Sequence, residues 1–284
     1  MTIELCPLSI DDIQSELKEI REIAASNTSI DLLETALSCI DLTTLNSTDT
    51  NGSVSAFTEK VNQFPVHYAG IKNVAAICVY PNMVQTVKET LKVSGVRIAA
   101  TAGGFPSSMT FLEVKIQEAN LAVAAGADEI DIVLPLWAFL EGDFETCSRE
   151  ISSIKKSIGK AHLKVILESG ILSPDQIWQA SLLSMEAGAD FIKTSTGKLP
   201  QAASPEAAMV MCMAIRQFYE QTGRKIGFKA AGGIVTPEDA LLYLTIVQEI
   251  LGTQWVSPEL FRIGASRLAN NLMEKITGNE TKHF

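Results

Sequence analysis

One stretch in the second half of the chain contains a helix, a turn and a strand in succession. Residues 173–195 read SPDQIWQASLLSMEAGADFIKTS. Ser173 before Pro174 is typical of a helix N-cap followed by proline at the first helical position, where the missing N–H is not needed. Gly188 ends the helix and leads into the apolar residues that predict a strand at 190–195. The stretch therefore indicates a chain in which helices and strands alternate.

The same unit recurs along the sequence. The residues Ala125-Gly126-Ala127-Asp128 are repeated at 187–190. The two stretches lie 62 residues apart, the length of two helix–strand units. Eight apolar stretches alternate with helical ones, and eight such units close a parallel barrel. We therefore predict the fold class α/β, a (β/α)8 TIM barrel, as a single domain over residues 1–284, with an additional N-terminal helix at 10–25 that covers the barrel bottom or its side. The predicted strands are Leu37–Asp41, Val74–Tyr80, Arg97–Ala102, Glu129–Pro135, Leu163–Leu167, Asp190–Ser195, Ile226–Ala230 and Phe261–Gly264, and the predicted helices are Val54–Gln63, Met83–Val93, Thr110–Ala125, Phe144–Ile158, Pro174–Ala187, Pro205–Gln221, Pro237–Leu251 and Arg267–Ile276.

The composition limits the kinds of partner. The net charge is −10, which argues against nucleic acid and against an anionic membrane surface, because both need a cationic protein surface. An anionic substrate must then be held by a local cluster of donors. The first 20 residues, with Glu4 among them, lack the basic and apolar regions of a signal peptide, and the five cysteines show no CxxC pair. We expect a cytoplasmic protein with reduced thiols and no membrane segment.

Two lysines interrupt strands that should be apolar. Lys193 lies in Phe-Ile-Lys-Thr and Lys229 in Gly-Phe-Lys-Ala, near the C-terminal ends of consecutive predicted strands. Strands of a parallel barrel are buried on both faces, and barrel active sites lie at this end. Each lysine alone could extend to the rim or pair with a carboxylate. Together they favour catalysis, because burial and a neighbouring cation both lower the pKa of an amine, and only a neutral amine attacks a carbonyl group.

Carboxylates and a thiol occupy comparable places in other strands. Asp131 lies in Glu-Ile-Asp-Ile of the fourth predicted strand and Asp41 ends the first. Each is either a catalytic group or a rim salt bridge or helix cap. Glu168 and Lys164 are interpreted as structural. Cys78 follows the inward alternation of its strand, although a buried cysteine is usually a small apolar residue.

Three loops at the same end are rich in groups that bind anions. They contain Thr196-Gly197-Lys198, Ala231-Gly232-Gly233 and Gly264-Ala265-Ser266. Barrels often hold a phosphate at the loops after strands seven and eight, through backbone N–H groups and a helix N-terminus. We therefore expect these loops, Thr196 included, to bind the phosphate of a substrate. No metal and no cofactor is expected, because the three histidines lack ligand spacing and no GxGxxG or P-loop pattern occurs.

Six motifs, in this order, resemble those of the deoxyribose-phosphate aldolase family of class I aldolases. They span residues 40–268 and read Asp41-Leu-Thr-Thr-Leu-Asn, Ala76-Ile-Cys-Val-Tyr-Pro, Gly126-Ala-Asp-Glu-Ile-Asp, Phe191-Ile-Lys-Thr-Ser-Thr-Gly-Lys, Gly227-Phe-Lys-Ala-Ala-Gly-Gly and Phe261-Arg-Ile-Gly-Ala-Ser. The resemblance implies reversible cleavage of 2-deoxy-D-ribose 5-phosphate to acetaldehyde and D-glyceraldehyde 3-phosphate. It implies that Lys193 forms the Schiff base, Lys229 perturbs it and Asp131 transfers protons. The residues that it implies for substrate binding are Asp41, Cys78, Gly197, Lys198, Gly232, Gly233 and Ser266.

The chain departs from this family in places. Arg267 follows Ser266 where some relatives carry a second serine, and it either adds charge to the phosphate site or points away. Gly103-Gly104 replaces a more polar pair. Some members end in a tyrosine that assists proton transfer, whereas this sequence ends in His283-Phe284. We expect a disordered terminus here, with His283 as the alternative proton carrier.

Two other functions stay open at this point. One is another Schiff-base enzyme, such as a transaldolase or a keto-acid aldolase. The other is a barrel that binds a phosphorylated ligand without chemistry, because a fold alone does not prove an activity. The expected partner is a small phosphorylated sugar, with no nucleic acid and no membrane, and the chain is expected to form a homodimer.

Overall fold

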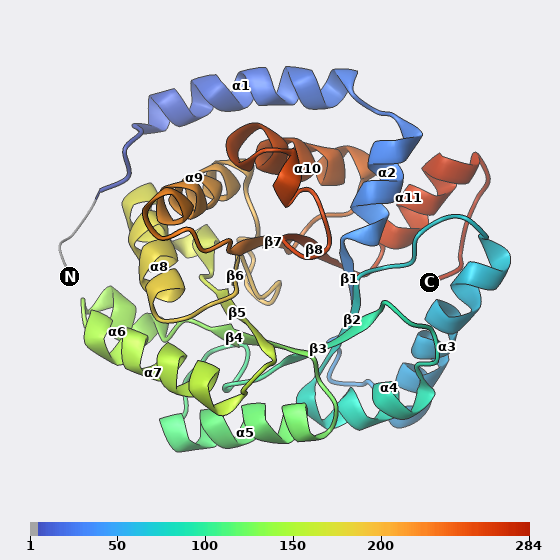
Figure 1. The fold of residues 1–284 in the computed structure, drawn as a ribbon, viewed down its shortest axis with the longest axis horizontal. Helices are drawn as coiled ribbons and strands as arrows, with labels where there is room; N and C mark the ends of the chain where they lie inside the picture. The colour runs from blue at the N-terminus through green and yellow to red at the C-terminus, as the bar shows by residue number, and fades with distance from the viewer. Residues whose placement is uncertain (1–4) are drawn as a thin grey trace.

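Eight parallel strands close into a barrel in the computed structural model, which describes residues 5–284 (Figure 1). Each strand pairs with the next, and the last pairs with the first. The predicted (β/α)8 fold is therefore confirmed. Residues 1–4, with Glu4, lie outside the described residues. The strands are β1 (Ile40–Thr43), β2 (Ala76–Val79), β3 (Arg97–Thr101), β4 (Glu129–Val133), β5 (His162–Ile166), β6 (Phe191–Lys193), β7 (Gly227–Ala231) and β8 (Phe261–Ala265).

Helices surround the barrel and connect its strands, and several begin at the predicted caps. Ser173, Ser204 and Thr236 each accept a hydrogen bond from a backbone N–H of the first turn, and a proline follows each of them. These caps fix where the helices begin, because their oxygens satisfy N–H groups that have no partner within the helix. The connecting helices are α3 (Asn51–His67), α4 (Val84–Thr90), α5 (Leu112–Ala124), α7 (Phe144–Ser157), α8 (Pro174–Glu186), α9 (Pro205–Thr222), α10 (Pro237–Leu251) and α11 (Leu268–Thr277).

Two short helices are absent from the sequence prediction. The sequence places the first strand at 37–41, whereas α2 (Ile30–Ser38) extends into that range and β1 begins at Ile40. Leu37, Cys39 and Ile40 are apolar, and a short apolar run at this junction fits the end of a helix as well as the start of a strand. The second, α6 (Leu136–Leu140), has five residues, too few for a helical period to be visible.

The predicted N-terminal helix is α1 (Ile10–Ser26), which lies along the side of the barrel. It begins at a capping box between Ser9 and Asp12. In Figure 1 it runs outside α9 and α10, and it contacts both. Of the two predicted positions, the side is therefore correct. No helix within residues 5–284 is long and apolar enough to cross a membrane.

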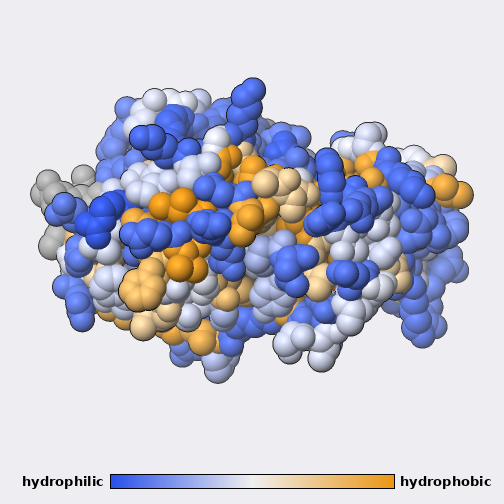
Figure 2. All heavy atoms as spheres, turned by 90° about the horizontal axis from the view of Figure 1, so that it is seen from below, coloured by the Kyte–Doolittle hydropathy of each residue, from blue (hydrophilic) through white to orange (hydrophobic). Residues whose placement is uncertain are grey.

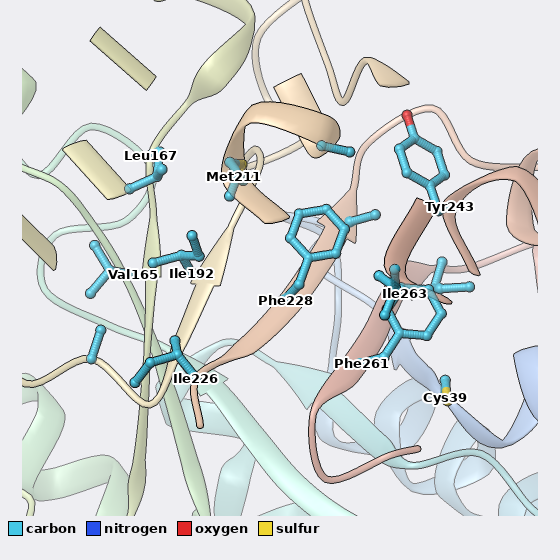
Figure 3. Packing of buried hydrophobic residues seen from close by; sticks show 14 of the residues in the cluster. Cys39, Val165, Leu167, Ile192, Met211, Ile226, Phe228, Tyr243, Phe261 and Ile263 are labelled. Carbon is cyan, nitrogen blue, oxygen red and sulfur yellow. The ribbon is translucent and has the colours of Figure 1, made fainter. Parts of the chain in front are cut away.

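Strand side chains that point outward pack against the helices. Val165, Ile192, Phe228 and Ile263 belong to a continuous apolar core between strands and helices, and Met211 of α9 lies over them (Figure 3). All five are buried, with at most 1% of their surface exposed. This outer interface supplies the apolar burial that stabilises the barrel.

Strand side chains that point inward form stacked layers, each with four residues from alternate strands, as is usual in barrels of this kind. The register pairs Cys78 with Ala99, and Thr101 with Asp131, so that these side chains share the inner face. Continuing the register around the barrel, and moving toward the C-terminal ends of the strands, gives four layers: Ala76, Glu129, Phe191 and Arg262; Asp41, Ala99, Lys164 and Lys229; Cys78, Asp131, Lys193 and Gly264; and Thr43, Thr101, Ile166 and Ala231. The inside of the barrel is therefore charged in its lower three layers.

Candidate active site

Lys193 and Lys229 lie side by side on β6 and β7 and point into the barrel. The strand register pairs the two residues directly, and both are buried. The Nζ atom of each lysine donates a hydrogen bond to Oδ2 of Asp131, at 2.8 Å in both cases. The structure thus brings the three residues predicted to be catalytic around one carboxylate oxygen.

The two lysines differ in the number of carboxylates that they contact. Lys229 also donates to Asp41, whereas Lys193 pairs with Asp131 alone among the described acidic residues. Burial lowers the pKa of Lys193, attraction to Asp131 offsets only part of this, and repulsion by Lys229 adds to it, so the pKa of Lys193 lies below its ordinary value. Burial also acts on Lys229, but Asp131 and Asp41 outweigh it and raise the pKa of this amine. Lys193 is therefore the lysine of this pair that loses its proton first.

Lys164 lies in the same inner layer as Lys229, and Arg262 lies in the layer below it. Lys164 donates to Glu129 and, at 3.1 Å, to Asp131. Arg262 donates to Asp41 at 2.6 Å and to Glu129 at 2.8 Å. The interpretation of Lys164 as structural agrees with these pairs, whereas Glu129 and Arg262 are not among the residues predicted from the sequence. The signal that singles out Lys193, a charge within a buried strand, applies equally to both of them.

The buried charges do not balance when every group is ionised. Three buried carboxylates, those of Asp41, Glu129 and Asp131, face four buried cations, those of Lys164, Lys193, Lys229 and Arg262, and Glu129 also pairs with the partly exposed Arg97 at 3.1 Å. Burial works against ionised carboxylates, yet the cations hold the pKa of Asp131 well below its ordinary value and lower that of Asp41. The carboxylates therefore stay charged. Loss of one proton from a lysine balances the cluster, and this favours neutral Lys193.

A cavity of about 300 Å³ opens above Lys193 at the C-terminal end of the barrel. The predicted anion-binding loops meet there, and the lining includes Thr196, Gly197, Lys198, Gly232, Gly233 and Ser266, together with Thr43 and Asn46 from the β1 side. Of the predicted site residues, Asp131, Lys229, Asp41 and Cys78 are not among the described lining residues: Asp131 and Cys78 are completely buried in the layer of Lys193, and Asp41 and Lys229 are completely buried in the layer below it. Among the predicted site residues, only Lys193 both lines the cavity and donates a hydrogen bond to the buried Asp131.

The loop after β6 is held in place by buried hydrogen bonds. Glu168 Oε2 accepts from the Thr196 hydroxyl at 2.6 Å, and Thr196 Oγ1 accepts in turn from the Lys198 N–H at 3.1 Å. The Lys198 side chain donates to the carbonyl oxygen of Leu45 after β1. Gly232 is left-handed (φ 91°), and a Cβ there would lie 3.0 Å from Ala202 in the loop. Glu168 is thus a support for this loop, and the Thr196 hydroxyl is already engaged.

Arg267 also lines the cavity. Within residues 5–284 its side chain makes no hydrogen bond or ion pair, and it lies just before α11 beside Ser266. A guanidinium without a protein partner at the anion-binding end is available for a phosphate. This position favours the alternative in which Arg267 adds charge to the phosphate site.

The C-terminal residues are ordered, which contradicts the expected disordered terminus. The Phe284 ring stacks on Phe64 of α3 with centroids 5.3 Å apart. Asn270 of α11 exchanges hydrogen bonds of 2.8 and 2.9 Å with the Phe284 backbone, and the His283 ring approaches the Lys60 carbonyl oxygen at 2.7 Å. Ring contacts and paired backbone groups are sufficient to order a short tail. His283 therefore lies on the outer surface of the molecule, outside the cavity lining.

Comparison with known proteins agrees with the motif resemblance. Residues 35–254 match the DeoC/LacD family of aldolases. The deoxyribose-phosphate aldolase of Homo sapiens is 42% identical over 262 residues, covering 88% of this chain and 82% of the human protein. The enzyme of that name from Bos taurus is 41% identical with the same coverage.

Solved structures give the same result for the fold. An aldolase called QR15 superposes with a TM-score of 0.70 at 29% identity, covering 85% of this chain and 96% of its own. The deoxyribose phosphate aldolase of Aeropyrum pernix superposes with a TM-score of 0.71 at 25% identity, covering 91% and 97%. With a match that spans most of the barrel and relatives above 40% identity, the chain belongs to the DeoC/LacD aldolase family.

Proposed function

We propose that the chain cleaves 2-deoxy-D-ribose 5-phosphate reversibly to acetaldehyde and D-glyceraldehyde 3-phosphate, through a Schiff base on Lys193. Relatives that carry the name of this enzyme support the substrate. The observation that carries the mechanism is the asymmetry of the lysine pair, in which Lys193 has a lowered pKa and Lys229 a raised one. A neutral amine beside a permanent cation is what imine formation needs.

The reaction follows from the arrangement around Lys193. The neutral amine attacks the open-chain aldehyde to give a carbinolamine, which loses water to become a protonated imine. The imine withdraws electrons, so the bond between C2 and C3 breaks and leaves an enamine on the lysine. Asp131, within hydrogen-bond reach of Lys193, moves protons to and from the carbinolamine and the C3 hydroxyl.

The cavity lining would hold the phosphate. Backbone N–H groups of the glycine loops, the Lys198 side chain and Ser266 surround the end of the cavity that lies away from the buried carboxylates. A phosphate bound there would place the sugar chain against Lys193, which lowers the barrier through positioning. Of the three buried barrel lysines Lys164, Lys193 and Lys229, only Lys193 is among the described lining residues, so it becomes the attacking group.

Borohydride reduction in the presence of acetaldehyde tests this proposal. Reduction of the imine should leave a two-carbon adduct on Lys193, found by peptide mass spectrometry, together with loss of activity. Lys115 is a matched control, because it is a buried lysine paired with Glu150 outside the barrel. An adduct on Lys229 instead would overturn the assignment of roles, and no adduct at all would favour a binding protein without chemistry.

The carbonyl compound that is trapped, if any, distinguishes the proposed function from two rival functions. A transaldolase or keto-acid aldolase would trap a ketone or keto acid in preference to acetaldehyde. A phospho-ligand-binding barrel would bind the sugar phosphate and show neither trapping nor turnover. Equal or better trapping with dihydroxyacetone or pyruvate than with acetaldehyde would favour the first rival.

We also propose a cytoplasmic homodimer built from a single domain over residues 1–284. Support for self-association comes from exposed apolar side chains on α5 and the loop before it, namely Met109, Phe111, Val114 and Leu121. Figure 2 shows apolar side chains gathered on this side of the molecule. Sedimentation of the protein and of a Phe111→Ser variant tests the dimer, and one cooperative unfolding transition is expected for one domain.

A further inference from the structure

Thr101 at the end of β3 carries a hydroxyl group that has no partner within the described protein. The residue is completely buried, and its Oγ1 atom makes no hydrogen bond. A buried hydroxyl without a partner destabilises a folded protein, and such groups are uncommon unless something else satisfies them. The hydroxyl therefore points to a small polar group that this part of the barrel receives.

The strand register places Thr101 next to the candidate catalytic residues. Its partner on β4 is Asp131, and it belongs to the inner layer directly above the one that holds Asp131 and Lys193. The other buried side chains without partners, Ser169, Trp178, Ser184 and Ser195, lie in helices or in the loop after β6. Among the described residues, Thr101 is thus the one unpaired hydroxyl that a barrel strand holds beside Lys193.

No step of the reaction proposed above uses the Thr101 hydroxyl. Asp131 serves the carbinolamine oxygen and the C3 hydroxyl, and the loops after β6, β7 and β8 face the phosphate. β3 stands across the closed barrel from β7. Thr101 is not among the described lining residues of the cavity, but Thr43 and Ala231 of the same inner layer are, so Thr101 lies at the level of the cavity floor, away from the phosphate-binding loops. The substrate carbon next to the one that forms the imine is C2, which carries no oxygen in a 2-deoxy sugar. The small side chains of Ala99 and Cys78 lie in the layers below Thr101.

We propose that Thr101 is a specificity-determining residue that hydrogen-bonds a hydroxyl on C2, so that the enzyme also takes glycolaldehyde as its two-carbon aldehyde. The inference rests on the proposed Schiff-base function. Lys193 adds to the glycolaldehyde carbonyl and water leaves; the imine then loses a C2 proton to Asp131 and becomes an enamine. The enamine carbon attacks the aldehyde of D-glyceraldehyde 3-phosphate, whose oxygen takes up a proton. Hydrolysis then frees Lys193 and an aldopentose 5-phosphate with a hydroxyl at C2.

Two substitutions at this position separate the hydroxyl from the space that it occupies. Thr101→Val keeps the shape and removes the hydroxyl, whereas Thr101→Ser keeps the hydroxyl and removes a methyl group. The measurement is kcat/KM for glycolaldehyde divided by kcat/KM for acetaldehyde, with D-glyceraldehyde 3-phosphate as the acceptor. We expect Thr101→Val to lower this ratio about tenfold, the effect of one buried hydrogen bond, and Thr101→Ser to retain it within about threefold. Cleavage of 2-deoxyribose 5-phosphate should be unchanged in both variants.

The outcomes distinguish this inference from the proposed function. Thermal unfolding of both variants is measured alongside, and Thr101→Val should be at least as stable as the parent, because it loses an unpaired buried polar group. An unchanged ratio in Thr101→Val, or an equal loss with both aldehydes, would overturn the role of Thr101 while leaving the aldolase intact. Failure of the parent protein to trap either aldehyde on Lys193 would instead overturn the proposed function, and this inference with it.

Discussion

The inner and outer faces of the same eight strands have opposite chemistry. On β6, Ile192 points outward into the apolar core and Lys193 inward to Asp131. On β7, Phe228 and Lys229 divide in the same way. Outward residues gain free energy by leaving water, whereas inward charges lose hydration and recover it only from one another. Stability therefore comes mainly from the outside of the barrel and reactivity from the inside.

This division depends on the two-residue period of a strand. Because neighbouring side chains point to opposite faces, a shift of one residue would exchange the two sets and bury isoleucine where a lysine is needed. The outer face tolerates changes of shape at a moderate loss of stability. The inner face has no such tolerance, because each charge has named partners within hydrogen-bond distance.

The largest difference between the two faces is expected when Lys193 alone is replaced on the inner face. Lys193→Leu should lower turnover of 2-deoxyribose 5-phosphate on the order of 10⁴-fold or more, as when an enzyme loses its nucleophile. The free energy of unfolding should change little or rise, because the variant removes a buried amine that the charge balance keeps neutral, while Lys164 and Lys229 still pair with Asp131. Steady-state kinetics and urea unfolding measure the two effects. If Lys193→Leu kept a tenth of the parent's turnover, the reactivity would not come from this lysine of the inner face.

The matching change on the outer face is Phe228→Ala, next to Lys229. Phe228 is completely buried and stacks on Phe261, so its removal should lower the free energy of unfolding by about 3–5 kcal/mol. The dependence of kcat on pH should stay as in the parent wherever the variant is folded. A displaced pH profile would show that the outer face also sets the chemistry of the lysines.

A smaller effect is expected for Lys229→Leu, which tests the pair on the inner face. Lys229 lowers the pKa of Lys193 by repulsion and also shares Asp131 with it. Without Lys229, both influences move the pKa of Lys193 upward, so less of its amine is neutral at a given pH. The alkaline requirement for activity should rise by about one to two pH units, seen in kcat/KM from pH 5 to 10. An unchanged profile at full activity would show that Lys229 is structural.

The contrast between the faces also explains what could be predicted from the sequence. Lys193 and Lys229 stand out because a charge is rare in a buried strand, and Gly232 because a sharp loop follows a strand. Arg262 and Glu129 carry the same signal, but their partners lie on distant strands, so their part in the charge balance appears only when the barrel is closed. The missing partner of the Thr101 hydroxyl is likewise a property of three-dimensional packing. The extent of α2 could not be predicted because the short apolar run at its junction with β1 fits either a helix or a strand.

Arg267 allows a test at the rim, where the inner face meets water. Arg267→Ser should reduce kcat/KM for 2-deoxyribose 5-phosphate about tenfold, or about 1.4 kcal/mol, mainly through KM, because one charged contact with the phosphate is lost. Turnover of unphosphorylated 2-deoxyribose should not change. Lys275→Ser on the same helix removes an equal charge outside the cavity lining and serves as the control. Equal losses in the two variants would indicate a general effect of charge.

The smallest effect on the chemistry is expected at the C-terminal tail, which belongs to the outside of the molecule. Removing residues 281–284 takes away the stacking of Phe284 on Phe64 and its two hydrogen bonds with Asn270, which should lower the free energy of unfolding by about 1–2 kcal/mol. Burial lowers the pKa of His283, so the docked ring is neutral at pH 7 and is held by the Lys60 carbonyl oxygen. The rate at which the acetaldehyde methyl group exchanges with D2O should therefore stay within about twofold of the parent. The contrary outcome is a tenfold loss of exchange, about 1.4 kcal/mol of barrier, that His283→Ala alone reproduces. It would mean that the tail leaves α3 and reaches Lys193 during the reaction. The outside of the molecule would then take part in the chemistry at this point.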